Sequence, residues 1–173
     1  MDGNSRYVFL DPYLGGLITV AEAARNVVCA GGRPLALTDG MNYGSPEKPE
    51  IFWQMKESVR GMAVACEFLS LPVTGGNVSL YNESGEDTIY PTPIIGMVGL
   101  IENLHHVTPS NFQSPGDQIW LLGETFAELG GSCYQEICSG GIFGNAPKLE
   151  LDREKRLQEA VLATIERLSL IHI

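Results

Sequence analysis

The chain has 173 residues, of which 44% are hydrophobic and 18% are charged, and its formal net charge is −10. This length and composition predict one globular domain, or one domain with part of another. The acidic balance argues against broad electrostatic capture of DNA, RNA or anionic lipid. The first residues lack the basic start and apolar stretch of a signal peptide, and no apolar run approaches ~20 residues. We therefore expect a cytoplasmic protein without a membrane span.

Cysteine and histidine offer no pattern of a metal or catalytic site. Neither a CxxC pair nor zinc-ligand spacing occurs among the four cysteines, Cys29, Cys66, Cys133 and Cys138. We expect four reduced thiols that pack as small apolar residues. The adjacent His105 and His106 lie in a polar stretch, which is more typical of a solvated linker than of catalysis.

The first amphipathic helix pattern ends at Gly31 and Gly32, because glycine favours the left-handed turn after a helix. Its apolar positions recur at helical spacing and are Leu17, Val20, Ala21, Ala24, Val27 and Val28. A strand is predicted over 35–38, and a turn-rich loop over 39–46.

A second amphipathic helix is predicted from Pro49, because proline suits the first helical turn. Gly61 inside it should cost about 1 kcal/mol relative to Ala, which indicates close packing against another backbone. The apolar positions of this helix alternate steps of three and four, and they are Phe52, Met55, Val59, Met62, Cys66 and Leu69.

Strand patterns dominate the next part of the chain. Residues 73–82 are predicted as a strand interrupted at 75–77, with a hairpin turn around 83–85. The run 94–101 is apolar at odd and even positions, which predicts a strand buried on both faces. After a polar junction, the sequence predicts a strand over 118–122, a glycine-rich loop and a final helix marked by Leu157, Val161, Ile165 and Leu168.

Two loops at strand ends carry candidate chemistry. The segment 38–44 holds a carboxylate, an amide and two glycines, which could contact a sugar, a base or a metal-bound phosphate. In the segment 75–82, Asn77 and Ser79 are two apart on an extended chain and should point the same way. Together the loops could hold a nucleotide phosphate and its Mg²⁺. Ordinary turns use the same residue types, so composition alone leaves both interpretations open.

Three segments together resemble one family. They are DPYLGGLITVAEAARNVVCAGGRPLA, ALTDGMNYGSPEKPEIFWQ and GGNVSLYNESGEDTIYPTPIIGMVGLIE, and from about Leu10 to Leu168 they resemble the second half of phosphoribosylformylglycinamidine synthase in its small synthetase-subunit form. The resemblance implies an α+β fold in which a mixed sheet with flanking helices forms an aminoimidazole ribonucleotide synthetase-like N-terminal domain over 1–102. A linker over 103–116 and the start of a C-terminal-type domain over 117–168 would follow. Residues 169–173 match nothing expected there and are a candidate non-native tail.

The family makes formylglycinamidine ribonucleotide from formylglycinamide ribonucleotide in purine synthesis, using ATP and glutamine. By motif, the resemblance implies that Asp39 and Gly76 contact ATP, Asn77 helps to hold Mg²⁺ and Ser79 contacts the ribonucleotide. Asparagine offers an oxygen to a hard cation and serine offers a hydroxyl, which fits these roles. No catalytic residue is assigned. The implied partners are a glutaminase subunit and a small accessory subunit.

The family's first half, with its catalytic histidine and most acidic Mg²⁺ ligands, has no counterpart here, so we expect a fragment that is inactive alone and self-associates. Two alternatives stay open. One is another ATP-dependent enzyme of the same fold, such as selenophosphate synthetase or thiamine monophosphate kinase, against which the NVSLYNE and PTPIIG strings argue. The other is a non-catalytic half that binds nucleotide for structure.

Overall fold

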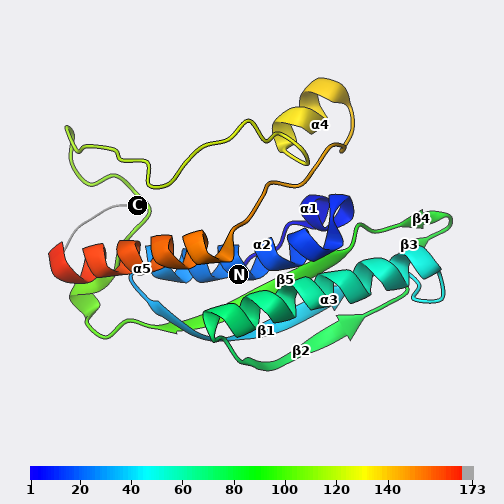
Figure 1. The fold of residues 1–173 in the computed structure, drawn as a ribbon, viewed down its shortest axis with the longest axis horizontal. Helices are drawn as coiled ribbons and strands as arrows, with labels where there is room; N and C mark the ends of the chain where they lie inside the picture. Colours follow the sequence, from blue (N-terminus) through cyan, green and yellow to red (C-terminus); the bar gives the residue numbers. More distant parts are fainter. Residues whose placement is uncertain (169–173) are drawn as a thin grey trace.

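A three-stranded sheet forms the centre of the computed structural model, which describes residues 1–168. The strands are β1 (Arg33–Asn42), β2 (Val73–Ser79) and β5 (Thr92–Leu100), in the order β2-β1-β5. β1 runs parallel to β2 and antiparallel to β5. Helices α2 (Pro12–Cys29) and α3 (Pro49–Leu69) pack on one face of this sheet (Figure 1). The predicted mixed sheet with flanking helices is confirmed.

The two large helices approach each other closely because glycines stand where they cross. A Cβ on Gly16 of α2 would overlap the carbonyl oxygen of Ser58, and a Cβ on Gly61 of α3 would overlap the carbonyl oxygen of Tyr13. The prediction that Gly61 packs against another backbone is therefore confirmed. A larger residue at either position would push the helices apart.

The buried side of α3 is rotated from the predicted apolar stripe. Met62 and Cys66 are buried as predicted, but Phe52 and Val59 are 49% and 45% exposed. The small residues Ser58 and Ala65 instead face the core. Because α2 and α3 cross closely, only small side chains fit on the side of α3 that faces α2. The spacing of hydrophobic residues therefore predicted the wrong buried side for part of this helix.

Tyr43 is the largest fully buried side chain, and it follows β1 directly. Its hydroxyl lies 2.6 Å from Ser58 Oγ, and Ser58 in turn donates to the Met55 carbonyl oxygen. Burial raises the pKa of Tyr43 to about 12. The tyrosine therefore stays neutral and links the end of β1 to α3.

Two predictions about where the strands end or break were wrong. Residues 39–42 belong to β1, and β2 continues through Gly75 and Gly76 without a break. The glycines sit in the strand because pairing with β1 supplies the hydrogen bonds that propensity alone does not predict. The hairpin prediction is confirmed by β3 (Glu83–Ser84) and β4 (Asp87–Thr88).

The sheet is covered on one face only. Leu37, Met41 and Ile95 point to the helices and are buried. The alternate positions of β5 remain open, since Val98 is 64% exposed and Ile94 is 37% exposed. The prediction that this strand is buried on both faces is therefore wrong for this chain, because no second layer covers the face opposite α2 and α3 within residues 1–168.

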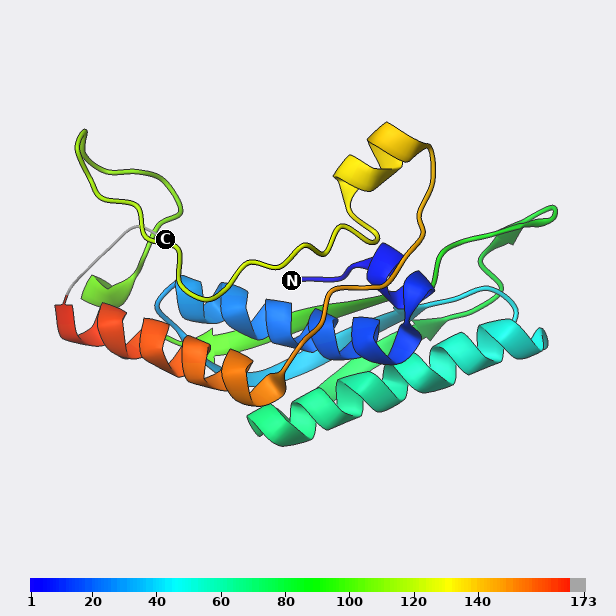
Figure 2. The ribbon, with the colours of Figure 1, turned by 45° about the horizontal axis from the view of Figure 1, so that its top comes forward.

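The segment that follows the sheet has little regular structure. It contains η1 (Leu104–His106), α4 (Cys133–Ser139) and the final helix α5 (Leu151–Leu168), joined by extended chain (Figure 2). The strand predicted over 118–122 is absent, and its apolar residues Ile119 and Trp120 are 79% and 77% exposed. A strand needs a neighbouring strand to satisfy its backbone, and the described residues provide none there. The predicted tail, 169–173, lies outside the described residues.

A half-buried ion pair holds α5 against α2. Arg25 donates from Nε and Nη2 to the two carboxylate oxygens of Glu154, at 2.8 and 2.9 Å. Gln158 donates to Glu154 and to the Ala21 carbonyl oxygen. This polar contact lies beside a small apolar cluster that includes Val28 and Ile165. The polar contact and the apolar cluster together hold α5 against α2.

The four cysteines are free, but only two fit the predicted burial. Cys66 is buried and Cys29 is half-buried, and burial raises the pKa of both thiols. Cys133 and Cys138 are exposed on α4, so the expectation that they pack inside was wrong. Among the described helices, none is both long and apolar enough to cross a membrane.

Candidate functional site

The four residues predicted to bind ligands lie on the neighbouring strands β1 and β2. In the parallel register Asp39 stands beside Gly76, Gly40 beside Asn77, and Asn42 beside Ser79. Residues that are almost 40 positions apart in the chain therefore occupy adjacent rows of one sheet. The tertiary structure brings Asp39 beside Gly76, and Asn77 and Ser79 follow on the same strand.

The strand alternation divides these four residues between the two faces of the sheet. Side chains of successive strand residues point to opposite faces, and directly paired residues share a face. Asp39 and Gly76 belong to the face that carries the buried Met41. Asn77 and Ser79 belong to the other, which we call the open face. The expectation that Asn77 and Ser79 point the same way fits this register.

Gly76 is required by the position of Asp39. A Cβ on Gly76 would overlap Asp39 Oδ1 and would lie 2.5 Å from the Asp39 carbonyl oxygen. Burial raises the pKa of the Asp39 carboxyl group, and the carboxylate in turn helps to raise the pKa of Cys66 on α3. Asp39 therefore lies in a partly dry environment between β1, β2 and α3.

On the open face, Gly40 leaves room beside Asn77. Asn77 Oδ1 lies 3.5 Å from the place where a Cβ on Gly40 would stand. Ser79 donates its hydroxyl proton to Asn82 Oδ1 at 3.2 Å. Asn82 itself donates from Nδ2 to the carbonyl oxygens of Tyr43 and Ser79, both at 2.9 Å. These bonds fix the direction of the serine hydroxyl and leave its oxygen as an acceptor.

Asn42 is a neighbour of this group that the sequence indicated only as the amide of the first loop. Its Nδ2 donates to the carbonyl oxygens of Gly40 and Thr92, both at 3.1 Å. It stands beside Ser79 on one side and Thr92 on the other. The sequence did contain a signal for a special role of Asn42, because asparagine is uncommon inside strands and this one ends β1.

Glu83 is a second residue that sequence reasoning did not select. Its Oε1 accepts from the backbone N–H of Ser45 at 2.7 Å, from Lys48 Nζ at 3.0 Å and from Thr88 Oγ1 at 3.2 Å. The Ser45 bond, followed by that of Lys48, lowers the pKa of Glu83. The carboxylate anchors the β3–β4 hairpin beside the end of the open face, and its oxygen is occupied by protein donors.

Residues 1–101 match the family model described as AIR synthase related protein, N-terminal domain. The match covers more than half of the chain and contains the whole sheet. The chain belongs to this family. The resemblance found in the sequence is therefore confirmed at the level of the family and the fold.

Several solved structures resemble this AIR synthase related chain over nearly its whole length. PurL from Thermotoga maritima complexed with ATP is 27% identical, with a TM-score of 0.66, and the match covers 95% of this chain and 23% of that one. Phosphoribosylformylglycinamidine synthase II from the same organism is 28% identical, with a TM-score of 0.64 and the same coverage. The fold is PurL-like, and the chain spans less than a quarter of the length of these relatives.

A third match extends the comparison to an assembly. PurLQS from Thermotoga maritima is 34% identical, with a TM-score of 0.56, and covers 64% of this chain and 18% of that chain. The PurL of that organism has also been solved with ADP, with AMPPCP and with FGAR, each at 27% identity. Related proteins of this fold therefore bind adenine nucleotides and the ribonucleotide.

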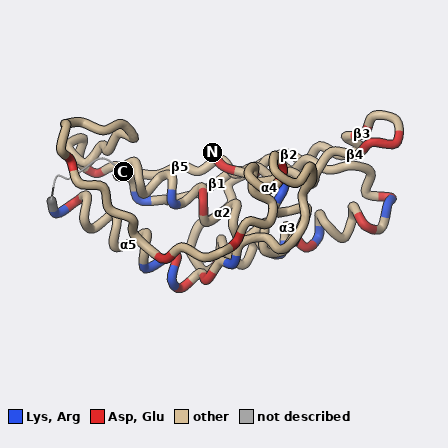
Figure 3. Tube along the Cα trace, turned by 90° about the horizontal axis from the view of Figure 1, so that it is seen from above, with Lys and Arg blue, Asp and Glu red and all other residues tan. Residues whose placement is uncertain are grey.

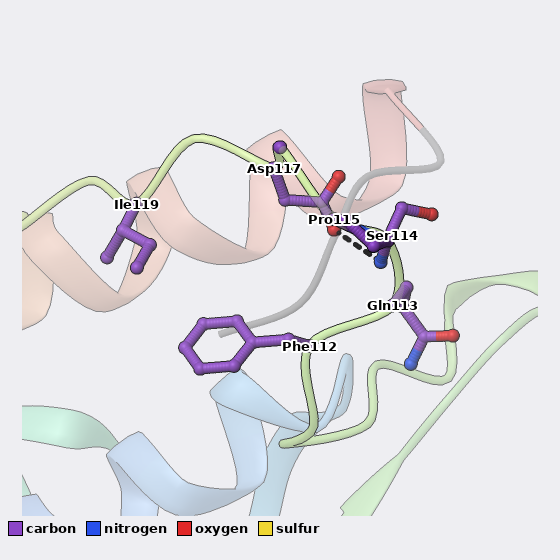
Figure 4. A pocket seen from close by; sticks show the side chains of 7 residues that line it. Phe112, Gln113, Ser114, Pro115, Asp117 and Ile119 are labelled. Carbon is purple, nitrogen blue, oxygen red and sulfur yellow. Dashed lines mark hydrogen bonds between the residues drawn. The ribbon is translucent and has the colours of Figure 1, made fainter.

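Two hollows of the AIR synthase related chain lie away from the candidate site. A hollow of about 440 Å³ is lined within one loop by residues including Phe112, Ser114 and Ile119 (Figure 4). Another of about 560 Å³ lies at the end of α3, beside Cys66 and Pro72. Neither contains a predicted site residue. The candidate site is an exposed sheet surface.

The residues of this domain do not by themselves fit a Mg²⁺ site. Within residues 1–168, no group of three or more His, Cys, Asp or Glu side chains could hold a metal ion. Mg²⁺ in proteins is usually held by one or two carboxylates with phosphates and water. The open face offers the neutral amide of Asn77, and the nearest carboxylate in the register, Asp39, belongs to the other face.

Proposed function

We propose that this domain is part of a phosphoribosylformylglycinamidine synthase, an ATP- and glutamine-dependent C–N ligase of purine synthesis. The observation that carries the proposal is the register of β1 and β2. It gathers Asp39, Gly76, Asn77 and Ser79 in a fold shared with relatives complexed with ATP and with FGAR. The register supports the proposal because it sets Asp39 of β1 beside Gly76, next to Asn77 and Ser79 on the same strand.

The reaction in this proposal transfers a phosphoryl group and then replaces it. ATP phosphorylates the amide oxygen of formylglycinamide ribonucleotide, which forms an iminophosphate and releases ADP. Ammonia derived from glutamine attacks the same carbon, and phosphate leaves with the former amide oxygen to give the amidine. Such catalysis depends mainly on holding the reacting groups in position.

The proposed roles of this chain's residues are binding roles. Ser79 Oγ, fixed by Asn82, accepts a hydrogen bond from the ribonucleotide. Asp39 and Gly76 contact ATP from the other side of the strands. If Mg²⁺ binds with the nucleotide phosphates, Asn77 would offer it one amide oxygen and the other ligands would have to come from outside this chain's described side chains.

The wider setting of the domain belongs to the same proposal. We infer that it works in the cytoplasm and that its partners are a glutaminase subunit and a small accessory subunit. The PurLQS relative supports association with other subunits. The division into an N-terminal domain over 1–102, a linker over 103–116 and the opening of a C-terminal-type domain over 117–168 is part of this inference.

One observation favours a second candidate function, a nucleotide-binding half with a structural role. Asp39 belongs to the helix-facing side of the sheet, whereas Ser79 belongs to the open face. An ATP contact at Asp39 is thus separated from the substrate contact at Ser79 by the strand itself. A structural nucleotide would tolerate that separation, whereas direct phosphoryl transfer requires the two ligands to meet.

Substitution in the complete synthetase that carries this domain tests the proposal. Ser79→Ala and Asn77→Ala should lower kcat/KM for amidine formation by roughly tenfold or more, because each removes a contact to the reacting ligands. Thr74→Val, which removes a hydrogen bond from β2 to the Leu37 carbonyl oxygen, is the matched control. Unchanged activity in both site variants would remove the open face from the reaction and leave the structural role.

A further inference from the structure

Asn42 presents a fixed and unused hydrogen-bond acceptor on the open face. Its Nδ2 has two protons, and both are donated, to the carbonyl oxygens of Gly40 and Thr92. These two bonds set the plane of the amide, so the direction of Oδ1 is set as well. Within residues 1–168, no donor forms a hydrogen bond with Oδ1.

Asn82 shows what the same arrangement looks like when it is purely structural. Its Nδ2 also donates to two backbone carbonyl oxygens, those of Tyr43 and Ser79. Unlike Asn42, it uses its Oδ1 as well, because Ser79 donates to it. The difference between the two asparagines is the oxygen, and only that of Asn42 is left for a ligand.

Asn42 stands beside Ser79 on the open face of the sheet. The two residues are paired in the register of β1 and β2, so they share a face and stand about 4.8 Å apart at the backbone. The Ser79 proton is already donated to Asn82, which leaves Oγ as an acceptor. This row of the open face therefore carries two acceptors that no described donor uses, and a ligand bound there would meet them with two donors.

The chemistry of the surrounding face selects the kind of donor. Among residues 38–42, 75–79 and 92–96, Asp39 is the only charged residue, and it belongs to the other face. In the charge-coloured trace, basic and acidic residues instead alternate along α3 and α5 (Figure 3). A phosphate would need basic side chains or free N–H groups, and a bare divalent cation would need carboxylates. Neighbouring hydroxyl groups meet neutral acceptors without either.

We propose that Asn42 Oδ1 and Ser79 Oγ bind the ribose cis-diol of the ribonucleotide, which makes Asn42 a ribose-binding residue. The inference rests on the proposed function, since it assigns part of the same ligand. In this arrangement the sugar hydroxyls lie over Asn42 and Ser79, and the phosphate points away from these two neutral residues. Gly40, next to this row, leaves space because it has no side chain.

Protein-observed NMR on the 173-residue chain tests this assignment, because it detects millimolar binding. The probes are formylglycinamide ribonucleotide, its 2,3-dideoxy analogue, and inorganic phosphate alone. The wild-type chain should bind the ribonucleotide roughly tenfold more tightly than the dideoxy analogue, and the Asn42 side-chain amide signals should shift. In Asn42→Ala the preference for the diol should fall by roughly fivefold, as expected for one lost hydrogen bond.

Thr74→Val is the control variant, since it loses a side-chain bond between β2 and β1 but no acceptor of the open face. It should keep the wild-type preference. If Asn42→Ala does not fold, the comparison of the two ribonucleotides on the wild-type chain still decides the assignment through the Asn42 signals.

Four outcomes would overturn the inference. If the wild-type chain binds both ribonucleotides equally, or if Asn42→Ala retains the full preference, the diol lies elsewhere while the proposed function stands. If inorganic phosphate alone shifts the Asn42 signals as the ribonucleotide does, the face binds anions instead. If the wild-type chain binds neither ribonucleotide, the proposed function fails together with the inference.

Discussion

The two adjacent glycines of β2 differ in the space available for a side chain. A Cβ on Gly76 meets the carboxylate and carbonyl of Asp39, whereas a Cβ on Gly75 meets nothing within 4 Å. Both glycines have ordinary strand conformations, so the difference comes from the space around them and not from the backbone. Substitution of Gly75 by alanine therefore tests strand propensity alone, whereas substitution of Gly76 also tests packing against Asp39.

We expect Gly76→Ala to lower the free energy of unfolding by about 1–3 kcal/mol, because Asp39 or the strand must move to admit the methyl group. Gly75→Ala should change it by less than about 0.5 kcal/mol. Urea unfolding followed by circular dichroism measures both. Equal effects of the two substitutions would contradict the close contact between Gly76 and Asp39.

Glu83 should make stability depend on pH in the acidic range. Its pKa is lowered from the ordinary value of 4.5, chiefly by the Ser45 N–H and then by Lys48. A carboxyl group with a lowered folded pKa contributes stability above its unfolded pKa and loses that contribution as pH falls through the folded value. We expect Glu83→Gln to unfold more easily than the wild type at pH 6, with the gap closing progressively below pH 4.5. Thermal melts from pH 3 to 7 test this, and a gap that persists at pH 3 would assign the effect to packing.

At the scale of elements, α5 depends on one polar contact more than on its apolar surface. Glu154 is only 7% exposed and receives both arms of Arg25, while the helix buries few apolar side chains. A buried carboxylate that loses its partner leaves an uncompensated charge, and so breaking the pair from one side costs more than replacing both partners.

We expect Arg25→Met to loosen α5 and to lower the free energy of unfolding by about 1–2 kcal/mol, because Glu154 is buried but the 40% exposed Arg25 is partly screened by solvent. The double variant Arg25→Met with Glu154→Leu should recover at least half of that loss, because no charge remains buried. Hydrogen exchange of the amides in α5, compared with those in α3, measures the effect. Equal protection of α5 in the wild type and Arg25→Met would show that apolar contacts alone hold it.

At the scale of the whole molecule, the open face of the sheet is one apolar surface that residues 1–168 leave uncovered. Val98 and Ile94 project from it, whereas the opposite face is packed under α2 and α3. Exposed apolar patches of a few hundred Å² commonly mark interfaces. Two copies that joined around a two-fold axis through the Val98 end of this face, six residues along β1 from Asn42, would form a closed assembly and leave the row of Asn42 and Ser79 free.

We predict that the chain forms a dimer or a larger species at micromolar concentration, as measured by light scattering. Val98→Glu should shift the population towards monomer, because it places a charge in the joined face. Phe52→Glu, which changes an exposed apolar residue on α3 outside the sheet, is the control and should leave the association unchanged. A monomeric wild-type chain with cooperative unfolding would contradict this prediction.

The sequence alone was sufficient for features that depend on local chemistry. Proline at the start of α3, glycines after α2 and the amphipathic repeats located the two main helices, and the motifs around Asp39 and Gly76 identified the family. Local patterns carry such features because caps, periodicity and motif spacing act over a few residues.

Only the tertiary structure decided which residues face which side and which share a site. The extent of β1 and β2 depends on their mutual pairing, and the buried side of α3 depends on the glycine crossing with α2. The strand predicted over 118–122 did not form because no neighbouring strand pairs with it among residues 1–168. The position of Asn42 beside Ser79 was decided in the same way. The two residues are almost 40 positions apart in the chain, and only the pairing of β1 with β2 brings them together.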